Sequence, residues 1–158
     1  MRQIPAPSTS PIPPCVNDPT LLADFIVEAR ELLDEATAAL VAVEGTHDRK
    51  ALETIFRVFH TIKGIVGFLA FDDIEAIARA GEDLAGAMRA RSGPVEQNEA
   101  VEAIRAALDL LHAFVDEVAG AMEEGRSRRP LAVASYVQRT LELALAADAP
   151  SADRGQAL

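Results

Sequence analysis

Residues 101–122 read VEAIRAALDLLHAFVDEVAGAM, and this stretch decides the fold class. Its apolar residues recur at intervals that alternate between three and four, which is the period of one face of an α-helix. The residues on that face are Val101, Ile104, Leu108, Leu111, Val115, Val118 and Met122. The pattern therefore predicts an amphipathic helix that buries one side.

The same period predicts two helices nearer the start of the chain. The first begins at Asp18, an N-cap residue followed by Pro19, and ends at Gly45. Its expected core residues are Leu22, Phe25, Ala29, Leu32, Ala36, Leu40 and Val43. The second helix begins after Asp48 and continues to the neighbourhood of Leu69.

A third helix is predicted to open at Asp72, where Glu75 three residues later resembles a capping box, and to close at Ser92-Gly93-Pro94. Its apolar stripe is Ile74, Ile77, Ala78, Gly81, Leu84, Ala85 and Met88. After the helix that contains residues 101–122, a basic linker, Arg126–Pro130, leads into a shorter fifth helix over Leu131–Ala147.

Together these elements predict an all-α protein, an antiparallel up-down four-helix bundle over residues 18–124 with an additional C-terminal helix. Residues 125–147 hold the basic linker and the fifth helix. The prolines of residues 1–17 exclude a helix, so we expect a disordered Pro-rich arm there and a disordered tail or linker over residues 148–158. No run alternates with a period of two, so no sheet is expected.

The chain has a formal net charge of −10, and the acidic excess falls on residues 18–124. An acidic body argues against nucleic acid and anionic membranes as partners. No apolar run has the length of a signal peptide or a membrane span, so we expect a cytoplasmic protein without membrane insertion. The single cysteine, Cys15, excludes an intramolecular disulfide and is interpreted as an incidental thiol.

His60 falls on the side of the second predicted helix that faces away from its core. At about 100° per residue, the apolar residues centre nearly opposite His60, whereas Lys63, Gly64 and Gly67 share its side. Each glycine costs about 1 kcal/mol relative to alanine inside a helix. The result is a bare strip beside an exposed imidazole, open to a docking partner, and Lys63 adds a cation suited to a phosphoryl group.

Residues 55–69, IFRVFHTIKGIVGFL, resemble the phosphohistidine motif of histidine phosphotransfer (HPt) domains. The similarity is greatest to the N-terminal HPt domain of chemotaxis histidine kinases of the CheA type. Residues 21–33, LLADFIVEARELL, are similar to the first helix of that family. The resemblance covers residues 18–124 and implies the same bundle fold.

The resemblance implies a role for several residues. His60 would be phosphorylated, and Lys63 would stabilise the phosphoryl group. Glu82, which follows the histidine by 22 residues, would bond the Nδ1 atom and orient the imidazole. The docking surface would comprise Gly64, Gly67, Phe56 and Arg79.

Two positions depart from the family pattern. Arg79 stands where chemotaxis kinases often have a second histidine, and Ala70 stands where they usually have glycine. Arg79 either assists phosphate binding or faces solvent, and the sequence does not favour one over the other. Ala70 is expected to alter the end of the second helix without changing the chemistry.

The function that the resemblance implies is histidine phosphotransfer in two-component or chemotaxis-type signalling. The histidine would take a phosphoryl group from a histidine kinase catalytic domain and give it to an aspartate of a response-regulator receiver domain. ATP and Mg²⁺ would be bound by those partners, so this domain would bind no cofactor and would be no enzyme by itself. A free-standing carrier and a piece of a longer CheA-type kinase both remain open.

Two other interpretations compete with this one. A helical-bundle interaction module without phosphorylation would have no need for His60, Lys63 and Glu82 together. A carboxylate-bridged metal site needs Glu-x-x-His on two helices, and only Asp109-x-x-His112 comes close. No metal site is therefore expected.

Overall fold

The computed structural model describes residues 18–46, 48–91 and 99–148, which form five helices. These are α1 (Pro19–Thr46), α2 (Arg49–Phe68), α3 (Asp72–Ala90), α4 (Glu99–Glu124) and α5 (Ala134–Asp148). The predicted arm over residues 1–17 with Cys15, the predicted third-helix end at Ser92-Gly93-Pro94, and residues 149–158 of the predicted tail lie outside the described residues.

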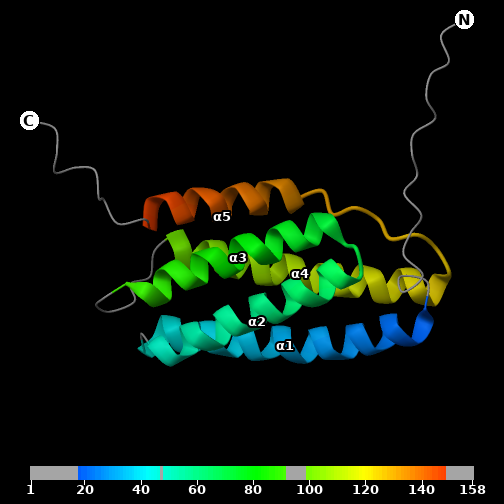
Figure 1. The fold of residues 1–158 in the computed structure, drawn as a ribbon, viewed down its shortest axis with the longest axis horizontal. Coiled ribbons are helices and arrows are strands. Elements are labelled where there is room, and N and C mark those ends of the chain that lie inside the picture. The colour runs from blue at the N-terminus through cyan, green and yellow to red at the C-terminus, as the bar shows by residue number, and fades with distance from the viewer. Residues whose placement is uncertain (1–17, 47, 92–98, 149–158) are drawn as a thin grey trace, which may run out of the picture.

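Consecutive helices run antiparallel, as Figure 1 shows. Helix α1 contacts α2 and α4, α3 contacts the same two helices, and α5 packs on α3 and α4. The all-α bundle with an additional C-terminal helix is therefore confirmed, and the described residues contain no strand. None of the five helices is both long enough and apolar enough to cross a lipid bilayer.

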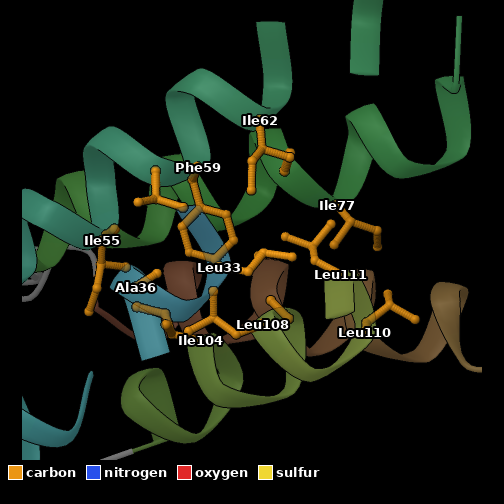
Figure 2. Close-up of a cluster of buried hydrophobic side chains, with 14 of the residues drawn as sticks. Leu33, Ala36, Ile55, Phe59, Ile62, Ile77, Ile104, Leu108, Leu110 and Leu111 are labelled. Atoms are coloured by element: carbon orange, nitrogen blue, oxygen red, sulfur yellow. The ribbon is translucent and has the colours of Figure 1, made fainter. Parts of the chain in front are cut away.

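The core is made of aliphatic and aromatic side chains and, among the described residues, holds no buried polar or charged side chain. Figure 2 shows side chains from α1, α2, α3 and α4 converging on one cluster, among them Leu33, Phe59, Ile77 and Leu108. Full burial of one such side chain contributes about 1.5–3 kcal/mol. Packing across the helices, more than helix propensity, therefore stabilises the bundle.

Two helix starts follow the predicted capping residues. Asp18 Oδ1 accepts a hydrogen bond from the backbone N–H of Thr20 at 2.9 Å, and Asp48 Oδ1 accepts one from Lys50 at the same distance. Each bond satisfies one of the free N–H groups of a first helical turn. These caps set where α1 and α2 begin.

The predicted capping box at Asp72 is wrong. Asp72 is already helical, Phe71 occupies the N-cap position, and no side chain bonds back to it. The ring of Phe71 is instead buried beside the rings of Phe25 and Phe114, at centroid distances of 6.2 and 5.1 Å. An aromatic anchor therefore sets the start of α3, and Glu75 is left to pair elsewhere.

The turn between α2 and α3 is a Schellman motif. The N–H of Phe71 donates to the carbonyl of Val66 at 2.9 Å, and the N–H of Ala70 donates to Gly67 at 3.1 Å. This motif requires a left-handed residue at the position of Ala70, where glycine is usual. Ala70 has φ = 61°, so the departure from the family pattern puts a strained alanine in this turn.

Three expected core positions differ from the structure. On α1, Leu22 is only partly buried. Leu33 is fully buried whereas Leu32 is only partly buried, because the buried face of α1 is shared between contacts to α2 and α4. On α4, Met122 is 40% exposed. A stripe with a spacing of three and four drifts by about 20° per heptad around a straight helix, so the last residue of the series leaves the core.

The basic linker is held along the bundle by its arginines. Arg126 pairs with Glu117 of α4 at 2.5 Å, and Arg128 binds both carboxylate oxygens of Asp73 at the start of α3. The guanidinium of Arg128 also lies 5.4 and 5.3 Å from the ring centroids of Phe71 and Phe114. The fifth helix begins at Ala134 rather than Leu131, because the chain turns at residues 132 and 133 after this linker.

Candidate functional site

The candidate site lies where α2 and α3 pack side by side. Phe59 of α2 is fully buried, and its ring lies against Gly81 of α3, which has no side chain to keep the helices apart. His60 follows Phe59 on α2, and Glu82 follows Gly81 on α3. Each of them is turned by about 100° from the residue before it, toward the surface. Close packing in the core thus brings an imidazole and a carboxylate from different helices together.

His60 points away from the core, as the helical phase predicts. Its side chain is 63% exposed, although its Nδ1 atom lies 3.2 Å from Oε1 of Glu82. The Glu82 side chain is only 14% exposed, because it lies in the seam between α2 and α3. One nitrogen of the ring is therefore tied to the protein while the ring as a whole faces solvent.

Lys63 shares the same carboxylate. Its Nζ atom lies 2.6 Å from Oε2 of Glu82, and its side chain is 27% exposed. Burial raises the pKa of Glu82, but hydrogen bonds with Lys63 and His60 and the charges of both outweigh burial, so the pKa lies below its ordinary value. Glu82 is therefore ionised at neutral pH and holds both side chains.

The charge of Glu82 decides which ring nitrogen of His60 carries the hydrogen. An ionised carboxylate only accepts hydrogen bonds, so Nδ1 must donate to it. The neutral imidazole then keeps its lone pair on Nε2, the nitrogen that can attack an electrophile such as phosphorus. The three side chains form an oriented nucleophile next to a cation.

Residues 20–147 match the family model of the Hpt domain. This chain belongs to the Hpt domain family. Membership identifies it as a histidine phosphotransfer module and confirms the resemblance that residues 55–69 carry. His60, bonded through Nδ1 to Glu82, lies within the matched residues.

This Hpt domain is similar to part of two curated chemotaxis proteins. The chain is 32% identical over 116 residues to the chemotaxis protein CheA of Halobacterium salinarum, a match to 67% of this chain and 17% of the relative. It is 28% identical over 101 residues to CheA of Treponema pallidum, which covers 63% of this chain and 12% of the relative. The chain thus spans less than a fifth of the length of these relatives.

A solved structure shares the fold. The phosphorylated P1 domain of CheA3, in complex with CheY6 from R. sphaeroides, superposes with a TM-score of 0.70 at 24% identity. The match covers 82% of this chain and 98% of that chain. The five-helix arrangement of this Hpt domain is therefore also found in a P1 domain.

The two glycines of the predicted docking surface have different surroundings in the Hpt domain. A Cβ atom on Gly64 would meet nothing within 4 Å, whereas one on Gly67 would lie 3.4 Å from the carboxyl carbon of Glu75. Gly64 is exposed, and Gly67 is partly covered by α3. The bare strip beside the imidazole is therefore centred on Gly64.

Arg79 is part of another pair. Its guanidinium lies 2.7 Å from Oε1 of Glu75, four residues earlier on α3, and its side chain is 62% exposed. The structure therefore joins Arg79 to Glu75 next to Gly67, and His60, Lys63 and Glu82 form a separate group. His112, the histidine of the rejected metal pattern, lies 3.2 Å from Thr37 Oγ1.

The resemblance implies that Phe56 belongs to the docking surface, and the sequence gives no sign of Arg89. The Phe56 ring is nearly parallel to the imidazole of His60, and the guanidinium of Arg89 lies 4.0 Å from the centroid of that ring. Arg89 comes from α3, 33 residues after Phe56 along the chain. A helical period carries no information on such a contact, because it relates only residues of the same helix.

Proposed function

We propose that His60 accepts a phosphoryl group from a histidine kinase catalytic domain and passes it to an aspartate of a response-regulator receiver domain. The single observation that carries the proposal is the hydrogen bond from Nδ1 to Glu82 in an imidazole that is 63% exposed. This bond leaves the Nε2 lone pair available to a partner. The chain supplies the nucleophile and a docking surface, whereas ATP and Mg²⁺ belong to the partners.

The first step makes one bond and breaks one. The Nε2 lone pair attacks the γ-phosphorus of ATP, the bond from that phosphorus to the β–γ bridging oxygen breaks, and ADP leaves. The phosphorylated ring keeps its hydrogen on Nδ1 and becomes cationic. The Glu82 carboxylate beside Nδ1 stabilises this charge, so the same contact orients the ring before the step and supports it afterwards.

The second step returns the electron pair. A carboxylate oxygen of the receiver aspartate attacks phosphorus, the P–N bond breaks, and its electrons return to Nε2. Lys63, one turn beyond His60, is the cation that stabilises the phosphoryl oxygens, and Gly64 lets the partner backbone approach. Both steps reuse the same oriented nitrogen.

The relatives support this choice of partners. The structurally similar P1 domain of CheA3 is described as phosphorylated and in complex with CheY6, and two of the relatives are named CheA. An acidic domain with an exposed histidine and no side chain at Gly64 suits docking by proteins rather than by nucleic acid.

The test is radiolabelling by the catalytic domain of a CheA-type kinase with ATP labelled at the γ-phosphate. The wild type should acquire an acid-labile label, and His60→Gln should acquire none. His112→Gln is a matched control, because it removes another helical histidine, and it should label like the wild type. Addition of a chemotaxis receiver domain should then move the label to the receiver.

Equal acid-labile labelling of His60→Gln and the wild type would exclude His60 as the acceptor. The same assay tests the interaction-module interpretation, which predicts no label in any variant. Glu82→Ala should slow labelling because the imidazole loses its fixed orientation. An unchanged rate would remove Glu82 from the site.

A further inference from the structure

Phe56 lies one turn before His60 on α2, and its phenyl ring is a neighbour of the imidazole. The phenyl and imidazole rings are nearly parallel, with an interplanar angle of 14° and a centroid distance of 6.3 Å. Aromatic pairs in this distance range attract each other by about 0.5–1.5 kcal/mol beyond the area that they bury. The imidazole therefore has a flat, nearly parallel neighbour as well as its bond to Glu82.

Helix α3 holds the Phe56 ring in place. The guanidinium of Arg89 lies 4.0 Å from the ring centroid, and its Nη1 donates to both carboxylate oxygens of Glu53 at 2.9 and 3.0 Å. A Cβ atom on Gly86 would lie 3.3 Å from Phe56 Cε2, so only a small residue lets the ring rest on α3. Phe56 is partly buried and is fixed from two sides.

A hydrogen bond to one ring atom does not fix a ring. The bond between Nδ1 and Glu82 restrains one ring atom, and coupled changes of the two side-chain torsions of His60 can still tilt the imidazole while keeping that bond. Such a tilt moves Nε2, and a displacement of about 1 Å at a reacting atom is enough to slow a reaction severely. A side chain that is 63% exposed has few other contacts to prevent it.

We infer that Phe56 is a positioning residue for the phosphoryl-accepting imidazole, held in that role by Arg89 and Gly86. Glu82 sets the hydrogen on Nδ1, and the Phe56 ring sets the plane in which Nε2 points. This inference rests on the proposed function for its consequence in phosphotransfer, but the geometry of the ring can be measured without any phosphorylation. In this role Phe56 orients the nucleophilic imidazole and is not part of the docking surface.

The first experiment records nitrogen-15 chemical shifts of the His60 ring in the unphosphorylated protein by NMR. In the wild type, Nδ1 should carry the hydrogen and Nε2 should have the shift of an unprotonated nitrogen. Phe56→Leu keeps an apolar side chain but removes the flat ring. The imidazole should then tilt and bond Glu82 less well, which should move both shifts toward the average of two exchanging tautomers. Phe68→Leu, which removes an exposed phenylalanine of the same helix, should leave them unchanged.

The second experiment separates positioning from docking. Phosphoramidate is a small donor that transfers its phosphoryl group to imidazole with release of ammonia and needs no docking surface. Because Phe56→Leu weakens the bond that makes Nε2 a better nucleophile, it should slow both this reaction and labelling by the kinase, by roughly three- to tenfold. Arg89→Lys, which keeps the charge but loses the flat guanidinium and its two bonds to Glu53, should slow both to a smaller extent.

Three results would overturn the inference. Unchanged ring shifts in Phe56→Leu would show that the phenyl ring does not orient His60. A loss of kinase labelling with an unchanged phosphoramidate rate would assign Phe56 to docking. Equal effects of Phe56→Leu and Phe68→Leu on the ring shifts would make the change nonspecific. If the wild type took no label from any kinase, the proposed function would fail while the ring shifts still decided the role of Phe56.

Discussion

Gly81 of α3 lies directly against the ring of Phe59 of α2. A Cβ atom on Gly81 would lie 2.5 Å from Cε1 of the Phe59 ring, closer than two such atoms can approach. The residues that follow them in the chain are Glu82 and His60, which are 3.2 Å apart at the surface. A contact in the core therefore sets the distance between the two reactive side chains.

The first prediction concerns Gly81→Ala. Alanine favours the helix by about 1 kcal/mol, but a core that must accept an extra carbon loses about 1–3 kcal/mol, and the fully buried Phe59 ring has no room to move. We expect a net loss of stability and a longer distance between His60 and Glu82. Urea unfolding and the nitrogen-15 shift of Nδ1 measure the two effects.

Gly64→Ala is the matched control for this prediction, because its Cβ atom would meet nothing within 4 Å. It should gain up to about 1 kcal/mol from helix propensity alone. Equal stabilities of the two variants would show that the helices can move apart at Gly81 without cost.

The second prediction concerns Ala70→Gly in the Schellman turn. A left-handed conformation costs an L-residue about 1–2 kcal/mol, and the greater freedom of glycine in the unfolded chain offsets about half of the gain. We expect Ala70→Gly to raise the free energy of unfolding by about 0.5–1 kcal/mol. Ala113→Gly, at an exposed helical position of α4, should instead lower it, and a loss in both variants would contradict the strain at Ala70.

The third prediction concerns the pH dependence of stability. The pKa of Glu82 is lower in the folded protein than its ordinary value of 4.5, because Lys63 and His60 bond the ionised form against the effect of burial. A lowered folded-state pKa contributes stability that is fully present above the unfolded pKa and is lost as the pH falls through the folded one.

Glu82→Gln removes this contribution while keeping the shape of the side chain. The variant should be less stable than the wild type at neutral pH, and the difference should shrink as the pH falls below 4.5. Urea midpoints of both proteins across the acid range measure the difference. A gap that stays constant down to the acid limit would mean that the Glu82 pKa is not lowered.

The fourth prediction concerns Arg128 of the linker that leads into α5. Arg128 binds Asp73 through two nitrogens and lies over the rings of Phe71 and Phe114. Arg128→Lys keeps the charge but loses the flat, two-pronged contact, so we expect a loss of about 1 kcal/mol and faster amide hydrogen exchange in α5. Arg129→Lys is the control, because only the backbone N–H of Arg129 bonds Glu117, and equal exchange in both variants would leave Arg128 without this role.

The parts of the site that lie on one helix could be predicted from the sequence, and those that join helices could not. Helical phase places His60, Lys63 and Gly64 on one exposed face, and the resemblance adds Glu82 from the next helix. Phase also indicated Gly81 as a core position, but not that Phe59 needs its empty space. The contacts of Arg89 with Phe56 and of Arg128 with Asp73 depend on the path of the whole chain.

The start of α3 is a second case in which a pattern within one segment did not predict a contact between helices. A local pattern of an acid followed by a glutamate three residues later predicted how α3 begins, but the packing of Phe71 among distant rings decided it. Burial of a large aromatic side chain outweighs a single capping bond of about 1 kcal/mol. Tertiary packing therefore overrode the local preference.

The open space around Gly64 separates the surface that a partner would touch from the side chains that orient the imidazole. The chemistry of the nucleophile is set by side chains in the seam between α2 and α3, whereas a side chain at position 64 would touch only a visiting protein. Under the proposed function, a change of size or charge at this position would alter the docking surface while the imidazole stays as it is. After a gene duplication or in a redesigned domain, a substitution at position 64 would let two copies of the domain dock different partners.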